Sequence, residues 1–411
     1  MSNINGITTK KGKIGANRST NKRAVSALVI ASVALAELAF NTPVTIYNID
    51  DLDQYGLDAE FDKTNNVNVY RHISEFYRMA GAGTELHLML VPATETLKTL
   101  VKSEAVKTLL ASANYEIRQI AFALNPTEAP TLVEGLPTDL IEAIPLAQGL
   151  ADWAFEQNMP CHIFLEGYNL EGNANVVTNL RTIENVAATK VSVVIGQDWK
   201  YADSKTGLAQ KLADVGTVLG VCSAASIAQN IGDNEMFDLN DATKDAWMIA
   251  GISNHKKNTE IFSQLQTFED KGYIFGLSYA GLAGIRINND HVCAPIIVDQ
   301  QGNMNEHTIA YGRVMDDAIR QLRTIYLPKI KKTYPVDEDG KLLIGSLVAL
   351  EQSGDDLFED MKNANEISLG KTTIDPNSDL LVEKELIVGF VIVPMGNLGE
   401  ITGTINIKNN L

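Results

Sequence analysis

Between Asn68 and Pro92 the spacing of hydrophobic residues changes from helical to alternating, which makes this stretch the clearest local unit in the chain. Its first half places apolar residues on one helical face: Val69, Ile73, Phe76, Tyr77 and Ala80. Gly81 and Gly83 follow, and glycine accepts the left-handed backbone that ends many helices. A strand with an alternating apolar side comes next: Leu86, Leu88 and Leu90. This order of helix, glycines and strand is the reverse of what a dinucleotide-binding motif needs.

Helical and strand-like patterns then alternate as far as residue 300. The segments with helical spacing are 94–113, 137–157, 176–188, 209–219 and 259–271. The segments typical of strands are 115–124, 161–166 and 190–195, followed by a strand, a glycine-rich turn and a second strand within 273–290. Because connections of this length suit crossover helices between parallel strands, the body is predicted to be α/β, with a mixed, largely parallel central sheet and flanking helices.

After about residue 300 the regular alternation of helical and strand-like segments ends, which predicts a C-terminal α+β domain over 301–397. A long helix is expected at 309–332, a turn at Asp337–Gly340 and a second helix at 341–363. A strand with two apolar faces follows within Leu381–Pro394. One face holds Leu386, Val388, Phe390 and Ile392, and the other holds Ile387, Val391 and Val393. A strand that is apolar on both faces is expected to be central and covered on both sides.

The last fourteen residues, LGEITGTINIKNNL (Leu398 to Leu411), also have a strand pattern. Ile401, Ile405 and Ile407 lie on one side of a two-residue repeat, and polar residues lie on the other. Chain ends fray unless something holds them, and a strand needs a neighbour for its backbone hydrogen bonds. The pattern does not tell whether that neighbour belongs to the same chain or to another.

Charge is distributed very unevenly along the 411 residues. The composition, 45% hydrophobic and 21% charged, is that of an ordinary globular protein. The net charge is −17, and the first 23 residues hold six cations and no acid, so −23 remains on the rest. An acidic chain is not expected to bind nucleic acid directly, because phosphate backbones require a basic surface. The basic N-terminal arm is interpreted as docking on another copy of the chain.

The segment Lys22–Phe40 has two possible interpretations. Its basic flank, apolar run and Ala34-Leu35-Ala36 sequence resemble a signal peptide, which would be removed. However, its polar lead-in is long and Glu37 interrupts the run, which is also short for a membrane span. A core segment of the mature fold is therefore favoured, with no signal peptide and no membrane contact. Three widely spaced cysteines predict free thiols.

Motifs that could carry chemistry fail in their context. GLSYAG (Gly276 to Gly281) is close to a serine nucleophile elbow, but a strand pattern follows where a helix is required, so a glycine-rich turn is preferred. SLGKTT (Ser368 to Thr373) lacks the first glycine of a phosphate loop and is interpreted as a surface turn. His72 and Glu75 are interpreted as a surface pair. No catalytic residue, cofactor or metal site is predicted, and the chain is not expected to be an enzyme.

Three parts of the sequence resemble contractile tail sheath proteins of phages and phage-like injection systems. These are the run ending NTPVTIYNIDDLDQYGL (Asn41 to Leu57), the helix–glycine–strand unit HISEFYRMAGAGTELHLMLVP (His72 to Pro92), and the C-terminal order that starts with YGRVMDDAIRQLRTIYLP (Tyr311 to Pro328). Residues 125–250 match the family least. The resemblance implies a virion tail or injection-system sheath assembled in the bacterial cytoplasm.

The resemblance also implies the partners and the interface. Subunits would stack as hexameric rings around an inner tail tube protein, with baseplate and terminator proteins at the ends. Extended arms, 1–23 and 398–411, would flank a body over 24–300 and add strands to neighbouring subunits. The residues expected at the subunit interface are Ile4, Ile7, Ile14, Leu386, Val388, Phe390, Ile392, Ile401, Ile405 and Ile407.

Two other functions are open. A soluble α/β enzyme would have a crevice at the carboxyl ends of its parallel strands. An exported solute-binding protein would require cleavage of the Lys22–Phe40 segment.

Overall fold

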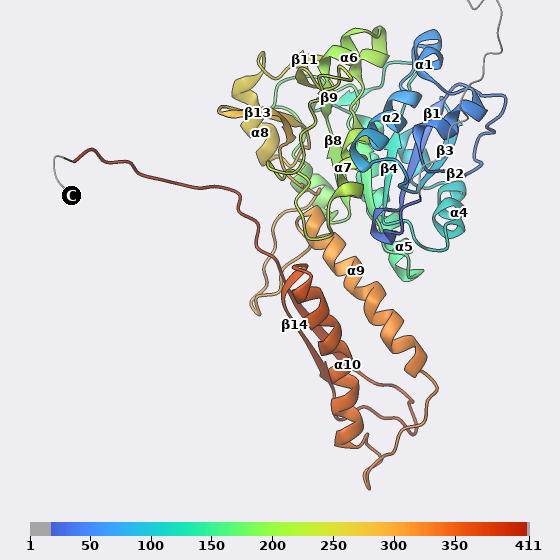
Figure 1. The fold of residues 1–411 in the computed structure, drawn as a ribbon, viewed down its shortest axis with the longest axis vertical. Coiled ribbons are helices and arrows are strands. Elements are labelled where there is room, and N and C mark those ends of the chain that lie inside the picture. The colour runs from blue at the N-terminus through green and yellow to red at the C-terminus, as the bar shows by residue number, and fades with distance from the viewer. Residues whose placement is uncertain (1–17, 409–411) are drawn as a thin grey trace, which may run out of the picture.

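A six-stranded sheet organises the body of the protein in the computed structural model, which describes residues 18–408 (Figure 1). Its strand order is β2-β3-β1-β4-β7-β8, and all neighbours are parallel except β2 and β3. The strands are β1 (Ser26–Ser32), β2 (Val44–Ile46), β3 (Leu86–Pro92), β4 (Gln119–Ala123), β7 (His162–Glu166) and β8 (Val191–Val194). The predicted mixed, largely parallel sheet is confirmed.

Helices cover both faces of this sheet, and β1 divides the core between them. Ala27 and Val29 of β1 pack toward α3 (Leu97–Leu100), α4 (Glu104–Ser112) and α5 (Thr138–Glu156). Leu28 and Ile30 pack toward α2 (Val69–Ala80) and α7 (Val215–Ala224). All seven residues of β1 are buried. The apolar part of Lys22–Phe40 is therefore the central strand of the fold, as the favoured interpretation expected.

Smaller elements complete the body. They are α1 (Ala59–Asn65), β5 (Leu132–Val133), β6 (Leu136–Pro137), β9 (Gly196–Asp198), α6 (Trp199–Asp203), β10 (Ala250–Ile252), β11 (Lys256–Lys257), α8 (Leu265–Asp270), β12 (Gly276–Tyr279) and β13 (Leu282–Ile287). The hairpin of β12 and β13 turns at Gly281, whose φ is 88°, so the preferred glycine-turn interpretation of GLSYAG is confirmed. The three cysteines are free and buried, as predicted.

Several helix predictions were wrong in detail. The segment 94–113 is interrupted, because the Ser103 side chain accepts the Ala105 N–H and starts α4 there. The segment 176–188 holds only a 3₁₀ helix (Leu180–Asn185), although Leu180 and Ile183 are buried. Apolar residues can reach a core from irregular backbone, so their spacing alone does not establish an α-helix.

The C-terminal part stands apart from the body (Figure 1). It contains α9 (Ile309–Tyr326), α10 (Ile344–Asn363), β14 (Ile367–Ile374) and β15 (Val388–Pro394). The two strands form an antiparallel pair along α10, so SLGKTT lies in β14 and its interpretation as a surface turn was wrong. The sequence did not show this strand, because Gly370, Lys371 and Thr372 carry no alternating apolar pattern.

Helix α9 joins the body to the C-terminal part through charged side chains in its first three turns. Asp317 accepts from Arg23 at 2.7 Å, and Asp316 accepts from Lys190 Nζ at 2.6 Å. Arg313 donates to the Ala225 and Ser226 carbonyls, and Arg320 donates to the Tyr115 and Pro160 carbonyls. Four side chains at one helix end are thus bonded into the edge of the sheet where the parallel strands begin.

We expect the Lys190→Met variant to lose about 3 kcal/mol of unfolding free energy, because it leaves the buried Asp316 and the partly buried Glu306 without their cation. Lys200→Met is the matched control, since the Lys200–Asp245 pair is exposed and worth at most about 1 kcal/mol. Urea unfolding of both variants checks this expectation. Equal losses would show that the joint does not depend on Lys190.

Candidate functional site: an open sheet edge and an extended tail

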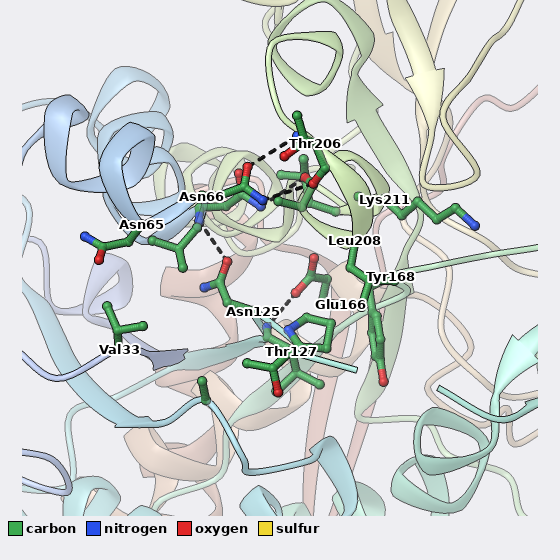
Figure 2. Close-up of a pocket in the computed structure, with 18 residues that line it drawn as sticks. Val33, Asn65, Asn66, Asn125, Thr127, Glu166, Tyr168, Thr206, Leu208 and Lys211 are labelled. Atoms are coloured by element: carbon green, nitrogen blue, oxygen red, sulfur yellow. Dashed lines mark hydrogen bonds between the residues drawn. The ribbon is translucent and has the colours of Figure 1, made fainter. Parts of the chain in front are cut away.

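A crevice of about 350 Å³ lies at the carboxyl ends of the parallel strands (Figure 2). The crevice opens at β1, where the order of the strands reverses: β3 lies on one side of β1 and β4 on the other. In α/β enzymes, ligands bind at such a reversal. Val33, Asn125 and Glu166 line the crevice from three neighbouring strands. The crevice that the enzyme interpretation required is therefore present, and its polar groups decide what it can do.

Those polar groups are bonded to the protein itself. Asn125 accepts from the Asn68 N–H and donates to the Ala31 carbonyl, both at 2.8 Å. Asn66 makes two bonds with the Thr206 backbone. Figure 2 shows these amides directed at backbone around the crevice. Bonds of this kind fasten loops together and use part of the hydrogen-bonding capacity of these side chains.

Glu166 has the most perturbed environment in the crevice. Its side chain is fully buried, and its two oxygens accept the Leu124 and Ala213 N–H groups at 2.6 and 2.9 Å. Burial raises the pKa of Glu166 to about 8, although both N–H groups act to lower it. A raised pKa suits a general acid, but here the carboxyl is used as an acceptor for two loops.

A second cluster of charges surrounds Arg71, which is 7% exposed. Its guanidinium bonds to Asp214 at 2.9 Å and to Asp198 at 3.2 Å, and Glu75 lies 3.5 Å away. The predicted surface pair of His72 and Glu75 was wrong, since both are buried within this network. Burial, together with Arg71, lowers the pKa of His72 to about 3, so this histidine is neutral. The cluster ties α2 to α7 and β9.

The described residues contain no group of three or more His, Cys, Asp or Glu side chains placed to hold a metal ion. Across residues 18–408, no helix combines the length and apolar character needed to cross a membrane.

The β14–β15 sheet has one packed face and one open face. Leu386, Val388, Phe390 and Ile392 point toward α9 and α10, with the Phe390 ring 5.7 Å from Tyr326 and 6.2 Å from Phe358. Ile387, Val391 and Val393 are 53%, 61% and 46% exposed. The expectation that this strand is covered on both sides was therefore wrong for a single chain.

The outer edge of β15 has no strand beside it within the described residues. Ile374 of β14 lies opposite Val388, and Thr372 lies opposite Phe390. The N–H groups of Ile374 and Thr372 point away from β15 and donate to side chains of α10. In an antiparallel pair, residues facing such a position turn away as well. The backbone groups of Val388, Phe390 and, by alternation, Ile392 therefore point to the outer edge of β15. Such an edge is a template for a further strand.

The tail leaves this sheet and runs away from both the body and the helices (Figure 1). Ile401, Ile405 and Ile407 are 81%, 96% and 101% exposed. Leu398–Lys408 is in no strand in the described part of the chain. The alternating tail segment thus has no strand partner among residues 18–408 of its own chain. Ile4, Ile7 and Ile14 lie outside the described residues.

Solved structures with a similar fold include sheath proteins of contractile systems. The anti-feeding prophage helical sheath in its contracted state is similar with a TM-score of 0.61 and 11% identity, over 99% of each chain. The sheath of PVC, an extracellular contractile injection system, has a TM-score of 0.55 and 8% identity, over 99% of this chain and 98% of that one. A sheath tail protein from Listeria innocua has a TM-score of 0.51 and 10% identity, over 92% and 96%.

Two family models match the sequence and together cover most of it. One is the DUF2586 N-terminal domain, over residues 9–291, and the other is the DUF2586 C-terminal domain, over residues 307–411. The chain belongs to the DUF2586 family. A search of curated proteins found no match.

We expect the free energy of unfolding to decrease between pH 6.5 and 9, because Glu166 ionises in this range. Its folded pKa, about 8, lies above the ordinary value of 4.5, so its contribution is complete below 4.5 and is lost as the pH rises through 8. Asp62, Asp214 and Asp290, whose pKa values are about 6, have largely ionised before this window. Glu166→Gln cannot ionise and should flatten the slope in urea unfolding.

Glu171→Gln serves as the control, because Glu171 is half exposed and pairs with Lys211. Its pH slope should equal that of the unaltered protein. An equal slope for Glu166→Gln would contradict the assignment.

Proposed function

We propose that this protein is the structural subunit of a contractile sheath, which polymerises as stacked hexameric rings around an inner tube and contracts to drive that tube forward. The observation that carries the proposal is the extended tail with three exposed isoleucines beside an open sheet edge on the same chain. The full-length likeness to helical sheath proteins supports the same function. Its setting would be a virion tail or injection system assembled in the bacterial cytoplasm.

In this proposal the tail adds a strand to a neighbouring subunit. Ile401, Ile405 and Ile407 cover apolar surface there, and the tail backbone bonds to the β15 edge. A strand held this way gains main-chain hydrogen bonds that it lacks in its own subunit. The N-terminal arm, with Ile4, Ile7 and Ile14, docks on another neighbour. Arms of this kind keep subunits connected while their bodies change packing during contraction.

The proposed parts are an N-terminal arm at 1–23, an α/β body at 24–300, a sheath-type domain at 301–397 and a C-terminal arm at 398–411. The inner tube protein contacts the assembled sheath, and baseplate and terminator proteins bound its ends. No cofactor, nucleic acid or membrane takes part. The bonded side chains of the strand-end crevice favour this structural function over an enzymatic one.

We expect negative-stain electron microscopy of the purified protein to show long hollow tubes, and the variant Ile405→Asp/Ile407→Asp to show none. The reason is that two buried carboxylates in the docked strand would lack a partner. A protein ending at Gly399 should behave in the same way. Thr404→Asp/Asn406→Asp is the matched control, since it adds equal charge on the polar side of the same strand.

Each alternative outcome has a definite meaning. Tubes from every variant would reject the role of the tail and keep the sheath. Discrete particles from the unaltered protein would count against self-assembly. Loss of tubes in the control as well would mean that charge alone blocks assembly, without strand docking.

A further inference from the structure

The outer edge of β14, unlike that of β15, is occupied. The Thr372 N–H donates to Asp355 Oδ1 at 2.7 Å, and the Ile374 N–H donates to Glu351 Oε1 at 2.9 Å. Lys371 Nζ holds the other oxygen of Asp355 at 2.7 Å. Both acceptors are side chains of α10. Two successive backbone donors that a strand would need on this side, those of Thr372 and Ile374, are therefore already used.

The two carboxylates are spaced as the carbonyls of a strand would be. Glu351 and Asp355 are four residues apart on a helix, which is about 6 Å along its axis. The Thr372 and Ile374 N–H groups are two residues apart on a strand, which is about 6.7 Å. The match lets one helical turn satisfy two successive outward donors of β14.

Two glycines allow α10 to approach the strand this closely. Gly354 lies between the two acidic residues, and a Cβ there would be 2.3 Å from Thr372 Oγ1. Gly370 of β14 packs on Phe358, where a Cβ would be 2.4 Å from Cγ of the ring. Any larger residue at these positions would push the helix away, so the arrangement depends on both glycines.

We propose that Glu351 and Asp355 act as a side-chain substitute for a strand and close the β14 edge, so that the tail of a second copy adds to this sheet only at β15. This proposal rests on the proposed function and adds a rule of specificity to it. A two-stranded sheet with two open edges could accept tails on either side or pair with another sheet. With one edge closed, each subunit accepts a tail at one defined place.

Disulfide trapping distinguishes the two edges. The full-length chain carries Ile405→Asp/Ile407→Asp, so that its own tail does not compete, and one new cysteine, either Thr373→Cys on β14 or Val391→Cys on β15. The probe is a synthetic peptide of Leu398–Leu411 with Thr404→Cys, and a second peptide with Thr402→Cys samples the other register. The three native thiols are buried and do not compete.

We expect about tenfold more adduct at Val391→Cys than at Thr373→Cys, because a disulfide needs Cβ atoms about 4 Å apart and the second strand along is out of reach. Adding Glu351→Ala/Asp355→Ala should raise the Thr373→Cys adduct to a level within about twofold of the Val391→Cys adduct, since it frees two strand donors. Gln352→Ala/Asp356→Ala is the control, because this bonded pair has the same spacing on the exposed side of α10.

Formation of as much adduct at Thr373→Cys as at Val391→Cys in the chain that keeps both carboxylates would overturn the closed edge. So would a folded alanine variant that gains no adduct there. If that variant does not fold, the variant Glu351→Gln/Asp355→Asn is measured in its place. Hydrogen exchange of this second variant must show the Thr372 and Ile374 amides protected as in the unaltered chain, and loss of that protection would count against the proposal. No adduct at either edge would instead reject strand docking itself, and with it the proposed function of the tail.

Discussion

The position of the β14–β15 sheet depends on one helix, α9, and on the charges at its first turns. Arg313, Asp316, Asp317 and Arg320 bond to the body, whereas Ala318 and Leu322 of the same helix pack under the C-terminal core. Removing Asp316 would leave the buried Lys190 with one partner fewer, and removing Arg313 or Arg320 would leave carbonyls without their donor, so the joint is costly to open. The direction of the β15 edge is therefore fixed relative to the body. A change in how copies pack has to occur outside this joint.

The tail is the part of the described chain that can absorb such a change. Pro394 ends β15, and the six residues Met395–Glu400 separate it from Ile401. A fully extended linker of this length reaches about 20 Å. Gly396 and Gly399 lie within it, and an added Cβ at either would meet nothing. In the proposed sheath, the sheet that donates a tail and the sheet that accepts it would have to stay within that reach in every state, while the direction between them would be free.

Local pattern predicted the elements whose partners are near in sequence or whose burial is complete. The helix at Val69–Ala80 and the strand at Leu86–Pro92 were predicted closely, because one chain buries their apolar residues. Leu381–Pro394 was predicted as a strand but with the wrong burial. Its second apolar face is real in the sequence, and a single chain does not cover it. A hydrophobic pattern predicts which side chains are covered, but it does not predict whether the same chain or another molecule covers them.

The sites were harder to predict, because their partners are distant. Glu351 and Asp355 are ordinary helix acids in the sequence, and nothing near them indicates that they bond to β14. The alternation of the tail was the one sequence signal for the proposed docking, and the sequence did not identify the partner. Arg71 meets Asp198 and Asp214 from more than 120 residues away, and the fold alone brings them together. Motif searches find functional residues that lie close together in the sequence, and this chain has few such groups.

Several carboxylates in this protein accept hydrogen bonds from backbone N–H groups. Asp62 accepts the first N–H groups of α2, at Val69, Tyr70 and Arg71. Glu166 accepts from two loops, and Asp290 accepts from Ala310 at the start of α9. Such bonds satisfy donors that helix starts, loops and strand edges leave open. Glu351 and Asp355 follow the same principle at β14, where they accept the outward N–H groups of Ile374 and Thr372. These acids are thus explained by the main-chain groups they satisfy, and the edge of β15 stands out because no carboxylate of the described chain accepts from it.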